Sequence, residues 1–280
     1  MKLVKAFSMG FCRGVKRALG KAEEAASAAS LRSIPVYVYG DIVHSDAVME
    51  HLSSLGIIRI ENAEEAEVPG IVIIRAHGIP DDEREAFLSR GFEIADATCP
   101  VVLSNQEKIR RAEEKAIIIG KKGHPEVLAL SGARRDAVII SSVGDLNLLS
   151  PSSYDAVLQT TFPEDRLSLI LEEAGKQGIN INLLNGICQA SVMRRRALCD
   201  IIPSSDAVAV IGSGNSSNTL ELLAIAKESG KPAFLISSPD TIPEELYSFA
   251  VVGITAGASA PDSLLDAVVR KLSESSHNVS

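Results

Sequence analysis

The stretch FEIADATC, residues 92–99, ends a predicted strand on a cysteine, and a helix-like pattern follows it. The stretch ININLLNGIC, residues 179–188, has the same order of strand, cysteine and helix pattern. Along the chain, 87 residues separate Cys12 from Cys99 and 89 separate Cys99 from Cys188. Equal spacing of three similar segments predicts a threefold internal repeat.

Further features recur between the cysteines in the same order. Each helix pattern leads to a short apolar strand that ends in glycine, and a polar loop follows. Later in each repeat, a second polar loop ends at a proline followed by an acid, which is typical of a helix start. The strands read VYVYG (36–40), AIIIG (116–120) and VAVIG (208–212), and the proline–acid pairs are Pro80-Asp81, Pro163-Glu164 and Pro261-Asp262.

The repeat predicts an α/β fold, a trefoil of three small parallel units. The third unit lacks a final strand, and KLVKAF, residues 2–7, would supply it. We therefore expect units at 13–98, 99–187 and 188–280, the last completed by residues 1–12. Ligands bind at the carboxyl ends of parallel strands, so the cysteines and polar loops should meet at one centre.

Charge and composition exclude several classes of function. A net charge of −8 disfavours binding to nucleic acid or to anionic lipid. No apolar run approaches the roughly 20 residues of a membrane helix. The first residues lack a long apolar segment, so we expect no signal peptide and a cytoplasmic protein. Four cysteines in such a chain indicate reduced thiols or a metal site.

Three converging thiolates would form a soft ligand set, suited to zinc or to an iron–sulfur cluster. Zinc could take a loop histidine as its fourth ligand. A cluster on Cys12, Cys99 and Cys188 would leave one iron open for a substrate oxygen. Cys199 lies 11 residues after Cys188 on one helical pattern, a rise of roughly 16 Å, so we expect a core cysteine there.

Two polar loops form a candidate phosphate site. Ser216, Ser217 and Asn218 lie in a glycine-bearing loop that leads into a helix, and Ser259 lies at a corresponding helix entrance. Backbone N–H groups, hydroxyls and a helix N-terminus together bind phosphate. The same residue types also serve as ordinary helix N-caps, and the sequence leaves both interpretations open.

Three histidines fall in matching strand-end loops, at His44, His77 and His124. A single loop histidine is ordinarily solvated or a cap, whereas three in corresponding loops favour hydrogen bonds to an anion. Glu126 is the carboxylate of this set of loops, so it is either a first-turn helix acid or a general acid. Thr160 is the corresponding polar group of the second repeat.

Seven motifs, in order along nearly the whole chain, carry a family resemblance: GFCRGV (10–15), AHG (76–78), DATCP (96–100), GHPEV (123–127), QTT (159–161), GSGNSSN (212–218) and TAGASAP (255–261). They resemble the 4-hydroxy-3-methylbut-2-enyl diphosphate reductase family, which ends the methylerythritol phosphate route to isoprenoids. The resemblance implies reduction of that diphosphate to isopentenyl diphosphate and dimethylallyl diphosphate. It also implies an external electron carrier, ferredoxin or flavodoxin.

The resemblance implies a trefoil around one [4Fe–4S] cluster, with Cys12, Cys99 and Cys188 as its ligands. The fourth iron would have no protein ligand. Glu126 corresponds to the proton donor, and Thr160 to a hydroxyl near the substrate alcohol. The substrate contacts that the resemblance implies are His44, His77, His124, Ser216, Ser217, Asn218 and Ser259.

The chain departs from the family pattern at Ser45, Ala129 and Ser191 and, after the second cysteine, at Ser104 and Gln106. These positions concern the surroundings of the cluster and none is a predicted ligand. Two other functions compete with the reductase. One is another three-cysteine trefoil such as quinolinate synthase, against which the GHPE and SSN motifs argue. The other is a phosphometabolite sensor with structural zinc, which metal analysis would distinguish.

Overall fold

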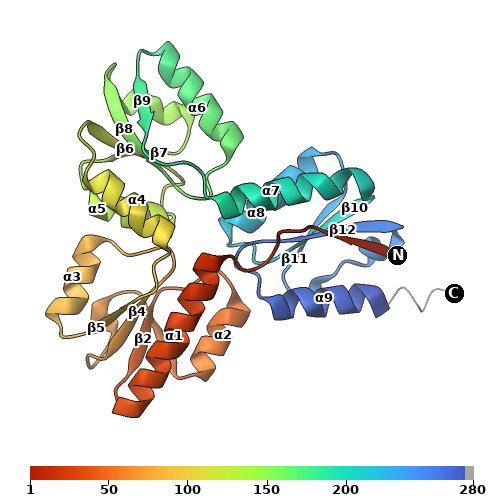
Figure 1. The fold of residues 1–280 in the computed structure, drawn as a ribbon, viewed down its shortest axis with the longest axis horizontal. Coiled ribbons are helices and arrows are strands. Elements are labelled where there is room, and N and C mark those ends of the chain that lie inside the picture. The colour runs from red at the N-terminus through yellow and green to blue at the C-terminus, as the bar shows by residue number, and fades with distance from the viewer. Residues whose placement is uncertain (275–280) are drawn as a thin grey trace. The chain divides into compact units, whose positions relative to one another are not determined.

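The computed structural model describes residues 1–274, which form three parallel four-stranded sheets with helices between their strands (Figure 1). The strand orders are β3-β2-β4-β5, β7-β6-β8-β9 and β11-β10-β12-β1. In all three, the first strand of the repeat lies between the second and the third. The predicted α/β class with three repeated parallel units is therefore confirmed. None of the helices in the described part of the chain is long and apolar enough to cross a membrane.

The first sheet is apolar on both faces at its centre. Strands VYVY and IVII are buried at every position, as expected for parallel strands that are covered on both sides. Phe87 of the following helix is fully buried against this sheet. The elements of this repeat are α1 (Arg13–Arg32), β2 (Val36–Tyr39), α2 (Asp46–Ser54), β3 (Ile57–Ile60), a 3₁₀ turn (Ala63–Glu65), β4 (Ile71–Ile74), α3 (Asp81–Ser89) and β5 (Glu93–Asp96).

The second sheet repeats this plan. The helix after Cys99 ends at Arg110. The carboxylate of Asp155 accepts the backbone N–H groups of Glu113 and Glu114 at 3.0 and 3.2 Å, which holds the chain in a turn there. The elements are α4 (Pro100–Arg110), β6 (Lys115–Ile119), α5 (Pro125–Ala133), β7 (Val138–Ile140), a 3₁₀ helix (Val143–Leu148), β8 (Ser153–Leu158), α6 (Glu164–Lys176) and β9 (Asn180–Leu183).

The third sheet combines both ends of the described chain. Strand β1 pairs in parallel with β12, with Lys2 opposite Val251 and Lys5 opposite Ile254. It occupies the position that β5 and β9 hold in the other sheets. The elements are β1 (Lys2–Lys5), α7 (Gln189–Ile201), β10 (Ala207–Ile211), α8 (Ser217–Glu228), β11 (Ala233–Ile236), β12 (Val251–Ala256), α9 (Asp262–Glu274) and the 3₁₀ segments Ile202–Ser204, Pro239–Thr241 and Glu244–Ser248.

The chain divides into two compact units. The third-sheet unit comprises residues 1–16 and 43–51 and the chain from Gln189 onward. The two-sheet unit comprises residues 17–42 and 52–188 and holds the first and second sheets. The three-unit boundaries expected from the repeat stay a prediction.

Candidate active site

Each unit holds half of the predicted site residues. The two-sheet unit contains His77, Cys99, His124, Glu126, Thr160 and Cys188, and the third-sheet unit contains Cys12, His44, Ser216, Ser217, Asn218 and Ser259.

Glu126 lies on the first turn of α5, and its side chain is only 1% exposed. Oε1 accepts the backbone N–H of Thr160 at 2.7 Å, and Oε2 accepts the Thr160 hydroxyl at 2.7 Å. Burial raises the pKa of Glu126 to about 7, although both hydrogen bonds from Thr160 act to lower it. The carboxyl group therefore exchanges its proton near neutral pH, the range in which a general acid is most effective.

The hydrogen bonds also determine which oxygen of Glu126 carries the proton. A backbone N–H can only donate, so Oε1 remains an acceptor in both protonation states. The proton of the neutral acid therefore lies on Oε2, next to Thr160 Oγ1. In that state Oε2 donates to Oγ1, and the Thr160 hydroxyl hydrogen becomes available to another acceptor. The pair can pass a proton from Oε2 through Oγ1.

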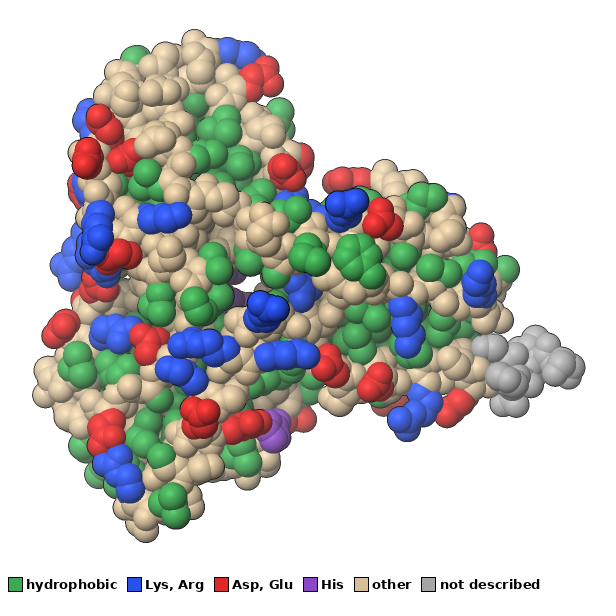
Figure 2. Space-filling view, viewed as in Figure 1, with side chains coloured by type: hydrophobic (Ala, Val, Ile, Leu, Met, Phe, Trp, Pro, Cys, Tyr) green, Lys and Arg blue, Asp and Glu red, His purple; other side chains and the backbone are tan. Residues whose placement is uncertain are grey.

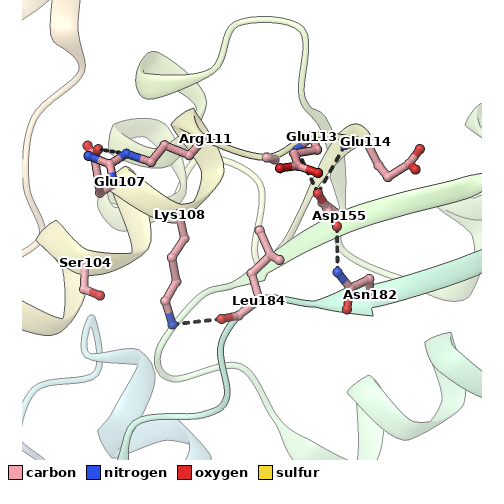
Figure 3. Close-up of a pocket in the computed structure, with 10 residues that line it drawn as sticks. Ser104, Glu107, Lys108, Arg111, Glu113, Glu114, Asp155, Asn182 and Leu184 are labelled. Carbon is pink, nitrogen blue, oxygen red and sulfur yellow. Dashed lines mark hydrogen bonds and ion pairs between the residues drawn. The ribbon is translucent and has the colours of Figure 1, made fainter.

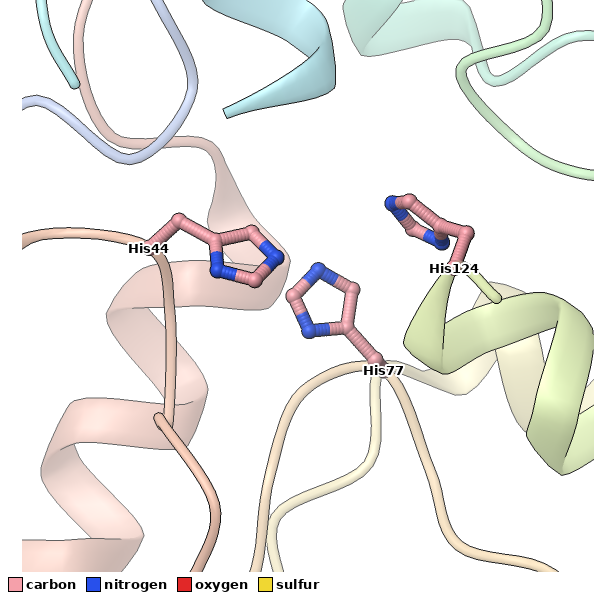
Figure 4. A group of neighbouring side chains, drawn as sticks. All are labelled: His44, His77 and His124. Atoms are coloured by element: carbon pink, nitrogen blue, oxygen red, sulfur yellow. The ribbon is translucent and has the colours of Figure 1, made fainter. Parts of the chain in front are cut away.

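His124 caps the N-terminus of α5. Its Nδ1 accepts the backbone N–H of Glu126 at 3.2 Å, so the neutral ring carries its hydrogen on Nε2. The ring packs edge-to-face with His77, with centroids 5.3 Å apart and planes at 89° (Figure 4). His124 is thereby held as a hydrogen-bond donor close to Glu126.

Backbone hydrogen bonds attach two predicted ligands to these loops. The N–H of Cys99 donates to Ala76 O at 3.0 Å, next to His77. The N–H of Cys188 donates to Thr160 O at 3.1 Å. Within the two-sheet unit, both cysteines are thus tied to segments that carry the histidines and the acid.

The loop that carries His77 requires a glycine after it. Gly78 has φ +82, which disfavours other residues, and a Cβ there would lie 3.2 Å from the Cβ of Ala129. Ala129 is fully buried on α5. The alanine that departs from the family pattern therefore packs directly against the histidine loop.

Gln106, on α4, supports the site, a role that no motif in the sequence predicts. Its Nε2 donates to Ile79 O at 3.2 Å and to Ala129 O at 3.1 Å, and the side chain is 6% exposed. It therefore joins the His77 loop to the helix of Glu126. The sequence signal that could have indicated a buried Gln106 is its spacing from Val102 and Ile109, which places it on the buried face of α4.

In the third-sheet unit, Asn218 connects two loops. Its Oδ1 accepts the N–H of Ala258 at 2.9 Å, which links the start of α8 to the loop after β12. Asn218 Nδ2 and Ser259 Oγ have no hydrogen-bond partner among residues 1–274, although the two residues are only 4% and 7% exposed. Unpaired buried polar groups are costly, so these atoms fit a ligand that brings oxygen acceptors.

The start of α8 is built closely against the loop after β12. Ser216 caps the helix by accepting the N–H of Thr219 at 3.4 Å, and Ser217 is the first helical residue. A Cβ on Gly257 would lie 2.0 Å from Thr219 Oγ1, so only glycine fits there. Ser216 is therefore a true N-cap, as the simpler interpretation of this loop expected.

Cys12 lies at the start of α1, and its Sγ accepts the N–H of Val15 at 3.4 Å. Buried Arg194 donates to Gly10 O at 2.5 Å and to Ala190 O at 2.8 Å, which fixes the segment before Cys12. No motif in the sequence predicts this role for Arg194. His44 is half-buried in the loop before α2.

The expectation of a buried Cys199 is wrong, because this residue is exposed. The buried face of α7 follows Ser191, Arg194, Leu198 and Ile201, and position 199 falls beside that stripe. None of the four cysteines forms a disulfide, and the three predicted ligands are half-buried. Each of these three thiols directly precedes a helix, and thiols are the ligand type that soft metals prefer.

A separate pocket of about 710 Å³ lies beside α4 in the two-sheet unit (Figure 3). Asp155 is bonded there to Asn182 and to the turn after α4, and Lys108 donates to Leu184 O. None of the predicted site residues lines this pocket. The hydrogen bonds of Asp155 and Lys108 in this pocket stabilise the fold.

The LytB protein family matches residues 3–273 of the chain. The chain belongs to the LytB family. Two similar LytB relatives are each named 4-hydroxy-3-methylbut-2-enyl diphosphate reductase. The relative from Treponema denticola is 33% identical over 98% of this chain and 100% of its own length. The one from Actinobacillus pleuropneumoniae serotype 7 is 36% identical over 97% of this chain and 90% of its own length. The family predicted from the motifs is thus confirmed.

Solved structures of LytB relatives have the same fold. The E-1-hydroxy-2-methyl-but-2-enyl-4-diphosphate reductase of Plasmodium falciparum matches with a TM-score of 0.88 and 29% identity, over 96% of this chain and 87% of that one. A second structure, of (E)-4-hydroxy-3-methyl-but-2-enyl diphosphate reductase, has a TM-score of 0.71 and 30% identity. It covers 98% of this chain and 100% of that one.

Proposed function

We propose that this chain is a cytoplasmic reductase that converts (E)-4-hydroxy-3-methylbut-2-enyl diphosphate to isopentenyl diphosphate and dimethylallyl diphosphate. This would be the terminal step of the methylerythritol phosphate pathway. The names of its LytB relatives support the reductase activity. Within the structure, the buried Glu126–Thr160 pair carries the proposal, because its pKa of about 7 suits a proton donor.

The reaction replaces a C–OH bond by a C–H bond. It consumes two electrons and two protons and releases the hydroxyl group as water. Glu126 would hold the proton for the leaving oxygen on Oε2 and pass it through Thr160 Oγ1. A proton supplied in this way lets water, the better leaving group, depart in place of hydroxide.

The thiols of Cys12, Cys99 and Cys188 would hold one [4Fe–4S] cluster. When bound, such a cluster supplies single electrons and one Lewis-acidic iron without a protein ligand. The three cysteines are half-buried and form no disulfide, which supports this assignment. A one-electron carrier, ferredoxin or flavodoxin, would deliver the electrons from outside.

The diphosphate would be bound by hydrogen-bond donors. Asn218 Nδ2 and Ser259 Oγ are buried donors that await an acceptor, and Ser216 and Ser217 lie at the N-terminus of α8, which favours anions. His124 Nε2 is a further donor. The family resemblance adds His44 and His77 to this set.

Metal analysis after anaerobic purification tests the proposal. We expect about four iron and four sulfide per chain, with visible absorption. Cys12→Ser, Cys99→Ser and Cys188→Ser should each abolish that absorption. Cys199→Ser is the matched control and should keep it, because Cys199 is exposed on α7. One zinc per chain without a visible band would instead support a phosphometabolite sensor.

A further inference from the structure

Positive charge is concentrated around Cys12. The chain has 28 Lys and Arg against 36 Asp and Glu, a net charge of −8. Residues 1–22 contain six of those cations and no acid, so the remaining residues carry a net charge of −14. The six cations of this basic segment are Lys2, Lys5, Arg13, Lys16, Arg17 and Lys21.

The position of these cations is unfavourable for the helix itself. Arg13, Lys16, Arg17 and Lys21 occupy the first half of α1, and its first turn has no acid. The helix macrodipole favours acids at that end and disfavours cations. Helix stability therefore does not account for this arrangement.

Two of the four α1 cations donate to backbone carbonyls, one forms a solvent-exposed ion pair, and the side chain of one has no partner among residues 1–274. Arg17 donates to Thr98 O and Lys21 to Asp96 O, both at 2.8 Å. Arg13 is exposed and has no hydrogen bond or ion pair within residues 1–274. Lys16 meets Asp262 at 3.3 Å, but their side chains are 58% and 68% exposed, so the pair contributes little.

The other two predicted ligands lack such a surface. The segment around Cys99 carries the acids Glu93 and Asp96. The segment 179–193 around Cys188 is uncharged, Arg194 is buried, and the first exposed cation after this cysteine is Arg196. Of the three cysteines, Cys12 alone has an exposed cation as its immediate neighbour in the sequence, which is Arg13.

An exposed aromatic ring lies on the same segment. Phe7 is 64% exposed, and it is the sole aromatic side chain among the exposed large hydrophobic residues of the described chain. It precedes Cys12 by five residues. Aromatic residues and arginine are enriched where proteins dock. Figure 2 shows Lys and Arg side chains gathered over the first half of α1.

We propose that this basic surface, formed by Phe7, Arg13 and Lys16 beside Cys12, is the docking site of an acidic one-electron carrier protein. The inference rests on the proposed function, because the reaction needs electrons one at a time. Each docked carrier is oxidised by one electron, and two are consumed in each turnover. Opposite charges steer such an encounter, and the −14 of the rest of the chain repels the carrier from other surfaces.

The test is a binding measurement with the holoenzyme and an acidic plant-type [2Fe–2S] ferredoxin, both oxidised. The double variant Arg13→Gln/Lys16→Gln should raise the Kd about tenfold at low salt, and the difference should shrink above about 0.1 M salt. The matched control Lys227→Gln/Arg270→Gln removes two exposed cations of α8 and α9. Its Kd should stay within about twofold of the parent, in line with a small effect of remote charges.

Turnover separates this inference from the proposed function. With dithionite and a small redox dye, Arg13→Gln/Lys16→Gln should match the parent, while ferredoxin-driven turnover should fall about tenfold at low salt. If the parent protein showed no turnover with the dye, the proposed function would be overturned. The Kd values for ferredoxin would still test the docking site independently. Equal Kd values for the two double variants would overturn the docking site. The docking site would also be overturned if Arg13→Gln/Lys16→Gln weakened binding to phosphatidylserine vesicles but left binding to ferredoxin unchanged.

Discussion

Glu126 and Asp155 are both buried carboxylates of the two-sheet unit, and their surroundings give them opposite acidities. Burial raises the pKa of Glu126 to about 7, and Thr160 is its hydrogen-bond partner. Burial also acts to raise the pKa of Asp155, but Asn182 and two backbone N–H groups donate to it and hold that pKa below its usual value. Deeper burial of Glu126 and the additional donor on Asp155, which lines an open pocket, together separate a proton donor from a structural anion.

The largest effect should be on turnover. Glu126→Gln keeps the size of the side chain but removes the acid, so turnover with dithionite and a redox dye should fall about 10²–10⁴-fold. Asp155→Asn should stay within about threefold of the parent in the same assay, since Asp155 lies in the separate pocket. If Glu126→Gln also stayed within about threefold, Glu126 would be a first-turn helix acid only.

The second effect is on stability as a function of pH. Because the folded pKa of Glu126 is raised, folding retains a proton between pH 4.5 and about 7 that the unfolded chain has released. The contribution of Glu126 to the free energy of unfolding is therefore fully present below pH 4.5 and is lost as pH rises through about 7. The free energy of unfolding should change by on the order of 3 kcal/mol over this range. Glu126→Gln should therefore be more stable than the parent at alkaline pH and similar at acidic pH. Urea denaturation of both proteins across this pH range measures the difference in stability. Parallel profiles of unfolding free energy against pH would contradict the prediction.

Asp155→Asn should lower the free energy of unfolding by about 1–3 kcal/mol. Both oxygens of Asp155 accept N–H groups, and the NH₂ group of asparagine would replace one of these acceptors by a donor. The control Glu113→Gln, an exposed residue of the same pocket, should change it by less than about 0.5 kcal/mol. Urea denaturation at neutral pH compares them. The depressed pKa of Asp155 gives stability that is present above its usual pKa and lost on acidification.

The last effect concerns the hydroxyl of Thr160. Thr160→Val removes a hydrogen bond that lowers the pKa of Glu126, so the alkaline limb of the pH–rate profile should move to higher pH. It also removes the oxygen through which the proton would pass, so turnover should fall at least about tenfold. Thr160→Ser keeps the oxygen, and both its profile and its rate should stay near those of the parent. A Val variant with an unchanged profile would show that Oγ1 does not tune the acid.

The repeat was predictable from the sequence because its period is long and its markers are distinctive. Cysteines, strand-end glycines and proline–acid pairs recur in register, and each marks a position fixed by backbone geometry. The same period placed the strand of residues 2–7 in the sheet of the C-terminal residues, where β1 pairs with β12.

The partners of buried polar groups could not be read from the sequence. Glu126 and Thr160 are 34 residues apart, and no local pattern gives the bond between them or the depth of burial that sets the pKa. Gln106 and Arg194 look like surface residues on amphipathic helices, yet they bind backbone carbonyls inside the structure. Their roles depend on how loops distant in sequence pack around them.

The pairing of β1 with β12 has a consequence for biosynthesis. Lys2 and Val251 are neighbours in the sheet but are made 249 residues apart. At a translation rate of roughly 5–20 residues per second, about 12–50 s pass between the synthesis of β1 and that of its partner strand β12. The first two sheets can form earlier from consecutive sequence, while the third closes a loop of nearly the whole chain, which slows folding. In a circular permutant with residues 1–12 placed after α9, the strands of each sheet would be consecutive in sequence. The nascent chain of this permutant should then form its third sheet as soon as β1 has been synthesised.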